Sequence, residues 1–425
     1  MKKLLGVLLA MALTWPAGAT VLSNVEVKGE IQTIASDVIH QIDVTDAVTT
    51  EPDGLYNRGA WTRAMAGLSA DLVEDVTANL MFQYAYMWGD KNEYGEGFSN
   101  GTGVKLVNAN VALHNLFCAF DLTVGRQFYG DEDSATMYFG PNHYNAELGA
   151  YAKAIDAAKL VYGDDVKTFT LLAGKMADTF EDYEVRDDRY DVEAVIMGAD
   201  FKLNITDALT AQVYGYNFNN MRAMDNTGVE TIQEEENLNM GFYGAKLAAN
   251  LEAFRASAEY ARNYGGHRLI KEHNPTGHMF KADIAADIKA VTARGTFYYA
   301  NEEFWAFGNY TPGLLVGHRL GGDLNEYSAE GVRLFNLGFD FKPFEKWIFS
   351  LDGYAFQGTH GNHAATWEAD LTAKYAHNEY VELFAGVGYA KYGNDEGYFA
   401  KEEYSAADNG RRDNVKGQLG MLIKF

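Results

Sequence analysis

The chain has 425 residues, 47% of them hydrophobic, 14% aromatic and 22% charged, with one cysteine. This composition excludes an intrinsically disordered chain and a disulfide-stapled scaffold. The formal net charge of −24 argues against binding to nucleic acid or to an anionic membrane surface, because both partners require basic patches.

The N-terminal residues have the three parts of a secretory signal peptide. Lys2 and Lys3 supply the positive end, residues 4–13 form an apolar stretch, and Ala17-Gly18-Ala19 is a small-residue cleavage site. The apolar stretch is too short to span a bilayer comfortably, which argues against a membrane anchor. We therefore expect residues 1–19 to be removed and residues 20–425 to form one exported domain.

A strict alternation of apolar and polar side chains follows. In residues 79–88 one face is apolar and aromatic, and the pattern recurs in residues 280–288 and 367–375. A period of two residues predicts β-strands with one apolar face. The single cysteine, Cys118, lies in the apolar run 116–120, and we expect it to be a small buried side chain.

Short polar turns join these strands into pairs. We expect eight turns, near positions 74–75, 114–115, 163–165, 206–207, 250, 287–289, 343–345 and 377–378. One further strand at residues 24–34 precedes the first pair, and another at 414–425 follows the last. The count predicts an all-β fold, a transmembrane antiparallel β-barrel of eighteen strands, or sixteen if one hairpin is miscounted, with short periplasmic turns and long extracellular loops.

Three features favour a bilayer over a secreted β-sandwich. Aromatic residues end the apolar faces of several strands, as in an interfacial girdle. The opposite faces carry full charges at mid-strand positions, which a packed sandwich core could not bury. The terminal Phe425 resembles the recognition signal of the bacterial outer-membrane assembly machinery. We therefore expect the protein in the bacterial cell outer membrane, with that machinery, outer-membrane lipid and lipopolysaccharide as partners.

The polar strand faces predict what lines the lumen of this barrel. Both charge signs occur on these faces in nearly equal numbers, which favours a water-filled channel, because a dry lumen could not accommodate them. The predicted basic set is Arg63, Lys159, Lys202, Lys246, Arg255, Lys281, Arg294, Arg333, Lys342, Lys374, Lys416 and Lys424. The predicted acidic set is Asp71, Asp121, Asp200, Glu259, Asp283, Asp287, Asp340, Asp352, Glu368, Asp370 and Glu382.

Most of the negative charge falls on loops, turns and rims, with two acidic clusters in the long loops. Residues 178–193 carry eight acids against Arg186 and Arg189, and residues 234–236 are three glutamates. These loops either concentrate cations at the channel mouth or form a solvated surface that divalent ions bridge to lipopolysaccharide. The first alternative predicts a modest cation preference that weakens as salt rises.

One stretch resembles a known family. Gly125-Arg126-Gln127 ends a strand, Tyr129-Gly130-Asp131 follows it, and residues 154–160 return to the barrel. This order resembles the alginate-export-like family of outer-membrane porins, which has a strand-end Gly-Arg-Gln, a following Gly-Asp and a downstream strand with an Asp-Gly-Val-like start. The resemblance implies an eighteen-stranded barrel, a monomer rather than a trimer, with Arg126 and Asp131 near the constriction. The alternative for Arg126 is a rim position that meets lipid headgroups.

The loop that follows this motif is long and predicts the gate. Residues 128–153 include Gly140-Pro141-Asn142, and loops of this length are often functional. We expect the loop to fold into the barrel and narrow it, with Tyr129, Asp131 or Tyr144 near the narrowest point. The alternative is a loop that stays in solvent.

Enzyme chemistry finds little support. The sequence has no Gly-x-Ser-x-Gly elbow, and its ten histidines match no closed metal-ligand spacing, so we expect no catalytic residue, no metal and no cofactor. The leading hypothesis is a passive outer-membrane porin for small hydrophilic solutes, such as sugars, sugar acids or cations. The alternatives are a structural or adhesive barrel that works through its extracellular loops, which an inward plug or a dense lattice of salt bridges would favour, and an outer-membrane hydrolase.

Overall fold

The computed structural model describes residues 23–40, 59–88, 104–144, 152–175, 195–221, 238–265, 277–301, 303–315, 331–359, 365–391 and 413–425. Eighteen strands form one antiparallel sheet that closes on itself, because β1 pairs with β2 on one side and with β20 on the other. Among the described residues, no helix is long and apolar enough to cross a membrane. The predicted signal peptide, residues 1–19, lies outside the described residues.

The barrel strands follow one another around the wall in chain order. They are β1 Ser23–His40, β2 Gly59–Val73, β3 Val76–Met87, β4 Lys105–Leu116, β5 Phe120–Gln127, β8 Ile155–Gly163, β9 Lys167–Lys175, β10 Val195–Thr206, β11 Leu209–Met221, β12 Leu238–Leu251, β13 Phe254–Gly265, β14 His278–Ile288, β15 Val291–Ala300, β16 Val332–Phe344, β17 Trp347–Gly358, β18 Thr366–Ala376, β19 Val381–Lys391 and β20 Asp413–Lys424. The predicted fold class and the count of eighteen are confirmed.

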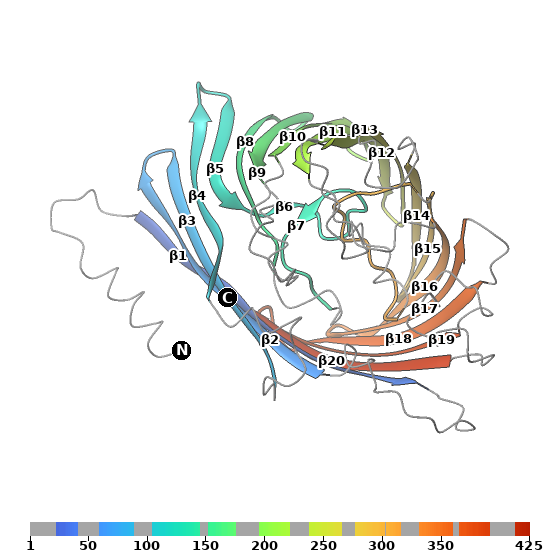
Figure 1. The fold of residues 1–425 in the computed structure, drawn as a ribbon. Helices are drawn as coiled ribbons and strands as arrows, with labels where there is room; N and C mark the ends of the chain where they lie inside the picture. Colours follow the sequence, from blue (N-terminus) through green and yellow to red (C-terminus); the bar gives the residue numbers. More distant parts are fainter. Residues whose placement is uncertain are drawn as a thin grey trace, which may run out of the picture.

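Two more strands lie apart from the wall. β6 (Tyr129–Gly130) pairs only with β7 (Tyr138–Phe139), as a small two-stranded ribbon. Figure 1 shows this ribbon inside the ring of strands. The chain between β5 and β8 therefore enters the barrel, as the sequence predicted.

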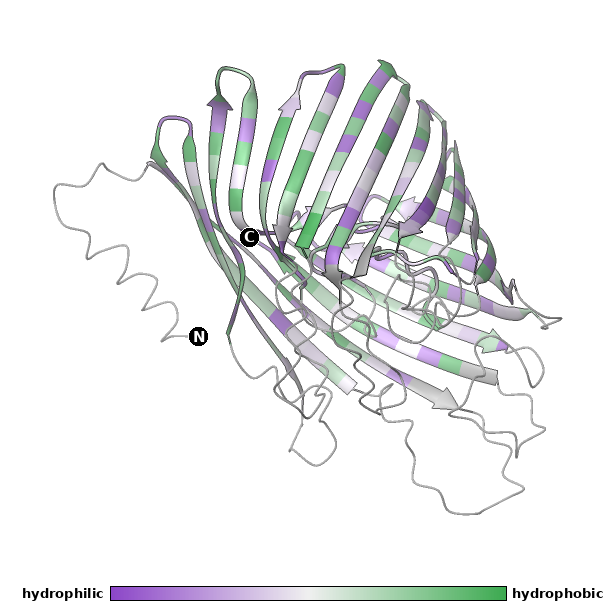
Figure 2. Cartoon of the chain, turned by 45° about the horizontal axis from the view of Figure 1, so that its top comes forward, coloured by the Kyte–Doolittle hydropathy of each residue, from purple (hydrophilic) through white to green (hydrophobic). Residues whose placement is uncertain are grey.

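The two faces of the wall follow from the alternation in the sequence. Along β16, Phe335, Leu337 and Phe339 are 55%, 58% and 42% exposed, whereas Leu334 between two exposed neighbours is 0% exposed. The three exposed side chains point out of the barrel and Leu334 points in. Figure 2 shows the resulting alternation of hydropathy along the strands. An outer face that leaves large apolar side chains exposed is suited to lipid.

Eight short turns connect neighbouring strands at one end of the barrel, in the hairpins that the sequence predicted. The turn between β4 and β5 differs in detail from its prediction. It lies at residues 117–119 rather than 114–115, and Phe117 and Cys118 adopt left-handed φ angles of 53° and 64°. Cys118 is therefore exposed, and its predicted burial is wrong, because the apolar run 116–120 contains the turn itself.

Candidate functional site

Two segments fold inward between the barrel strands. The first inner segment is residues 128–144 and the second is residues 303–315. Their backbones pair directly, since Tyr138 N donates to Phe307 O at 2.7 Å and Phe307 N donates to Thr136 O at 3.0 Å. The Asn309 backbone N–H also donates to Ser134 O at 2.8 Å. The two segments together form one partition inside the barrel.

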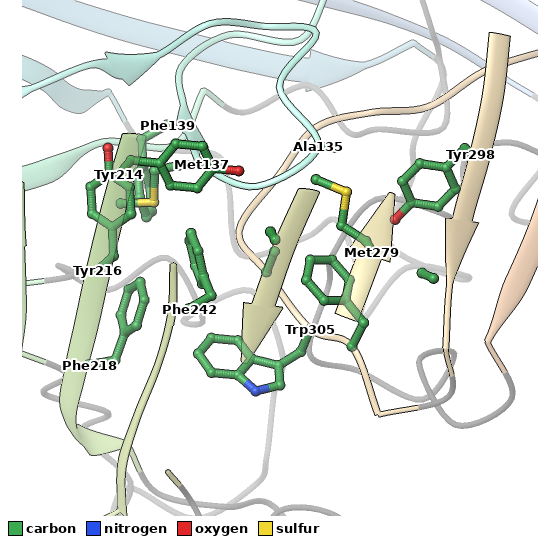
Figure 3. Close-up of a cluster of buried hydrophobic side chains, with 14 of the residues drawn as sticks. Ala135, Met137, Phe139, Tyr214, Tyr216, Phe218, Phe242, Met279, Tyr298 and Trp305 are labelled. Atoms are coloured by element: carbon green, nitrogen blue, oxygen red, sulfur yellow. The ribbon is translucent and has the colours of Figure 1, made fainter. Parts of the chain in front are cut away.

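An aromatic cluster packs this partition against one side of the wall. Trp305 lies edge-on to Phe218 of β11 and to Phe242 of β12, with ring centroids 5.7 and 5.9 Å apart. Met137 and Phe139 of the first inner segment belong to the same buried cluster, which Figure 3 shows in close-up. Burial of so much aromatic surface holds the partition against β11 and β12.

Ion pairs anchor the first inner segment on the other side of the lumen. Arg63 of β2 is completely buried, and its Nη2 donates to Glu30 Oε1 at 2.7 Å and to Gln32 Oε1 at 2.6 Å. The same Nη2 lies 3.0 Å from the carbonyl oxygen of Asn142. One buried guanidinium thus joins β1, β2 and the first inner segment, with its charge compensated by Glu30.

His143 extends this network. Its Nδ1 lies 2.8 Å from Glu132 Oε2 and its Nε2 lies 3.0 Å from Glu30 Oε2. Burial lowers the pKa of His143, but the hydrogen bonds to Glu132 and Glu30 outweigh burial and raise it above its usual value. Both ring nitrogens face carboxylates, so the charged form, in which both donate, fits this site.

The second inner segment is held through its backbone. The N–H groups of Leu314 and Leu315 both donate to Glu368 Oε1 at 2.7 Å, and that of Leu314 also donates to Asp370 Oδ2 at 2.9 Å. Lys416 Nζ donates to the Leu314 carbonyl at 2.6 Å. Gly313 has a φ of 83°, a left-handed conformation that glycine adopts readily and that allows adjacent N–H groups to turn toward the carboxylates.

Two polar cavities border the partition. A cavity of about 410 Å³ is lined on one side by Tyr129, Asp131 and Thr136 of the first inner segment. Its wall side presents both charge signs, from Lys159, Lys246, Asp200 and Glu259. A second cavity, of about 390 Å³, lies among Glu132, His143, Asn309 and Tyr310.

Tyr129 and Tyr144 lie on the partition. The hydroxyl of Tyr129 is 2.8 Å from that of Tyr216, and burial raises the pKa of Tyr129 to about 12. Tyr144 packs edge-on against Phe384 of β19, with ring centroids 5.2 Å apart. Lys374 Nζ lies 3.5 Å from the centre of the Tyr144 ring.

Most of the charged residues predicted for the lumen lie on the inner face of the wall, with their side chains pointing into the barrel. Arg294 is bound by Asp340 and Asp352 at 2.8 and 3.0 Å, and Arg255 by Asp287 at 3.0 Å. Lys159 lines the larger cavity with Asp131, whereas Asp121 lies near the short turn, where it accepts a hydrogen bond from Asn115 N at 3.2 Å.

The structure places Arg126 on the outer face of the wall. Register puts it opposite Asp156, next to the inward-facing Ile155 and Ala157, so both charged side chains point outward. Arg126 Nε and Nη2 donate to the two Asp156 oxygens, each at 2.8 Å. The expected position at the constriction is therefore wrong, and the alternative, a rim arginine, fits the geometry.

Arg333 also points outward. It pairs in register with Tyr299 and Gln357. Its position alternates in phase with Phe335 and Leu337, which lie on the outer face. Arg333 was predicted to point inward with the other charged residues, but it lies seven positions before Asp340, which faces the lumen. A period of two places residues at odd separations on opposite faces.

Sequence reasoning missed Glu30, Glu132 and His143, and the whole of the second inner segment. The segment had one signal, the apolar run Phe304-Trp305-Ala306-Phe307 in a long connection between two predicted hairpins. In the described part of the chain, no group of three His, Cys, Asp or Glu side chains is placed to hold a metal ion. The acidic stretches 178–193 and 234–236, together with His267, His273, His360 and His363, lie outside the described residues.

No family model and no curated protein sequence matches the chain. Solved structures do resemble it. Pseudomonas aeruginosa OccK11 (OpdR) aligns with a TM-score of 0.59 at 10% identity, over 96% of this chain and 97% of that one. Acinetobacter baumannii OccAB1 aligns at 0.59 and 11%, over 96% and 99%. The outer membrane protein opdK from Pseudomonas aeruginosa aligns at 0.57 and 9%, over 94% and 99%. The shared feature is the closed antiparallel eighteen-stranded barrel.

Proposed function

We propose that this protein is a bacterial outer-membrane porin, a passive channel for small hydrophilic solutes. The observation that carries the proposal is a lumen wall with charges of both signs around a partition bordered by polar cavities. Charged side chains are tolerated on that wall if water fills the lumen. The outer face is apolar, as a lipid-facing surface must be, and opdK, which has the same fold, is an outer membrane protein.

The charged side chains that line the larger cavity indicate which solutes can bind there. It presents Lys159 and Lys246 together with four carboxyl side chains, of Asp131, Asp133, Asp200 and Glu259, so both signs are present with an acidic excess. A small polar solute such as a sugar or a sugar acid can bond to both kinds of group. A long polyanion needs a basic path, which argues against alginate as the solute, and the alginate-export-like resemblance rests on residues 125–160 alone.

Bilayer recordings with the purified protein test this function. We expect discrete conductance steps, and a larger step after deletion of residues 133–144, because that deletion removes most of the first inner segment. Arg333→Gln is the matched control, since its outward side chain should leave the step unchanged. A barrel that inserts and never conducts would contradict the proposal.

A structural or adhesive barrel is the second candidate. The observation in its favour is the partition itself, which is anchored by the His143–Glu30 ion pair on one side and by an aromatic cluster on the other. The same recordings separate the two candidates, because an adhesive barrel with a permanent plug would show no steps in either the full chain or the deletion variant.

Export and orientation are part of the proposal. Residues 1–19 would be removed as a signal peptide, Phe425 would be read by the assembly machinery, and the short turns would face the periplasm. Phe425 closes the barrel by exchanging backbone hydrogen bonds with Gly29 at 2.7 and 3.0 Å. In intact cells the exposed turn residue Cys118 should resist a membrane-impermeant thiol reagent and react after lysis. Labelling before lysis would reverse the assigned orientation.

A further inference from the structure

The outer face of the barrel carries its charges at one end. Parity and register place a set of described charged side chains on this face near the long-loop ends of their strands. The basic members are Arg126, Lys175, Arg262, Arg333 and Lys391, and the acidic members are Asp37 and Asp156. Lys167, beside a short turn, is the one outward charge of the described strands at the other end. This rim is net basic although the whole chain has a charge of −24.

The charges near β5, β8 and β9 compensate one another. Arg126 holds Asp156 through two hydrogen bonds, and Lys175 lies opposite Asp156 in register. Arg262 of β13 and Arg333 of β16 differ from them. Both are exposed, and neither forms an ion pair with a described residue. Two guanidinium groups are thus free to bind an external anion.

Aromatic side chains surround these two arginines. Tyr243 lies opposite Arg262 in register, and Tyr299 lies opposite Arg333. His278 stands between them, with its ring 5.6 Å from that of Tyr299 and 6.5 Å from that of Tyr260. The two arginines are three strand spacings apart, about 14 Å across the sheet. Tyrosine and arginine at the end of an apolar band are typical of the level at which lipid headgroups lie.

We propose that Arg262 and Arg333 bind the phosphate groups of an anionic lipid in the leaflet on the long-loop side. A guanidinium presents two N–H donors in a fixed fork that matches phosphate oxygens, and the adjoining tyrosines can lie against the acyl and headgroup boundary. A lipid with two phosphates could occupy both arginines. The proposal rests on the membrane location in the proposed function, and it is independent of solute passage.

Thermal unfolding of the purified barrel in neutral detergent micelles tests this site, followed by the fluorescence of its tryptophans. Diphosphoryl lipid A is the probe, and phosphatidylcholine at the same concentration is the lipid control. We expect lipid A to raise the melting temperature of the wild-type barrel and phosphatidylcholine to leave it almost unchanged. The double variant R262Q/R333Q should lose about half of that rise or more, because the charge-assisted phosphate contacts are gone.

Lys167→Gln is the matched variant, since it removes an outward charge at the opposite end and should keep the full rise. An equal rise in R262Q/R333Q and the wild type, or an equal loss in Lys167→Gln, would overturn the site. The conductance of R262Q/R333Q should match the wild type. A wild-type barrel that never conducts but shows the lipid A shift would refute the porin and leave the lipid site standing.

Discussion

The two inner segments meet in one partition, yet different forces hold them. The first inner segment is anchored by charged side chains, in particular Arg63, Glu30 and His143, which are buried between the segment and the wall. The second is anchored by its own backbone N–H groups, bound to Glu368 and Asp370, and by the Trp305 ring in the aromatic cluster. The first anchor depends on the protonation of a histidine, whereas the apolar part of the second does not.

This difference indicates which inner segment can be displaced more easily to widen the lumen. A charged anchor weakens when one partner is removed or neutralised, because the remaining buried charges are then less well compensated. An aromatic anchor fails only by loss of contact area. We therefore expect the first inner segment to move before the second.

The largest effect should follow from Arg63→Ala. The substitution leaves the buried Glu30 with His143 alone as its cationic partner and breaks the bond to the Asn142 carbonyl, which should weaken docking of the first inner segment by about 3–5 kcal/mol. Single-channel recordings should show a larger and noisier conductance. Arg294→Ala is the control, because Arg294 bonds only to wall carboxylates in the described contacts. Wild-type conductance in a folded Arg63→Ala barrel would refute the charged anchor.

A smaller effect should follow from Glu368→Gln. The amide keeps one acceptor oxygen for Leu314 and Leu315 but loses the charge that strengthens both bonds, at a cost of about 1–3 kcal/mol. Because the aromatic cluster still holds the second inner segment, we expect only a modest rise in conductance. Asp283→Asn serves for comparison, since its carboxylate bonds to Ser257 and Thr296 of the wall. An effect of Glu368→Gln larger than that of Arg63→Ala would reverse the proposed order.

The smallest effect should be a dependence on pH through His143. Its pKa is raised in the folded chain, so the stability it adds is complete below the ordinary pKa of histidine and is lost as the pH rises through the raised value. The groups that face it are Glu132, Glu30 and, through Glu30, Arg63. Conductance should therefore increase with pH across that window, and His143→Gln should remove the increase. A pH response that persists in His143→Gln would assign it to another group.

Much of the fold could be predicted from residue order alone. Alternation with a period of two marks strands wherever one face is apolar, and short polar turns mark hairpins, so the eighteen strands could be counted without a structure. The entry of residues 128–144 into the barrel was also predictable, from the length of the loop. The charged inner face followed from the same parity, with the exception of Arg333, which has the parity of the apolar outer face.

The contacts that build the partition could not be predicted in this way. Arg63 meets Asn142, 79 residues away, and Trp305 meets Phe218, so each pair exists only once the barrel has closed and both segments have folded in. The net charge of −24 likewise gave no sign of two arginines on the outer rim that form no ion pair with a described residue. Residue order determined the strands and their faces, because the period of a strand is a local property of the backbone. The tertiary structure alone decided which charges are paired, buried or left free, because the energy of a charge depends on neighbours that are distant in the sequence.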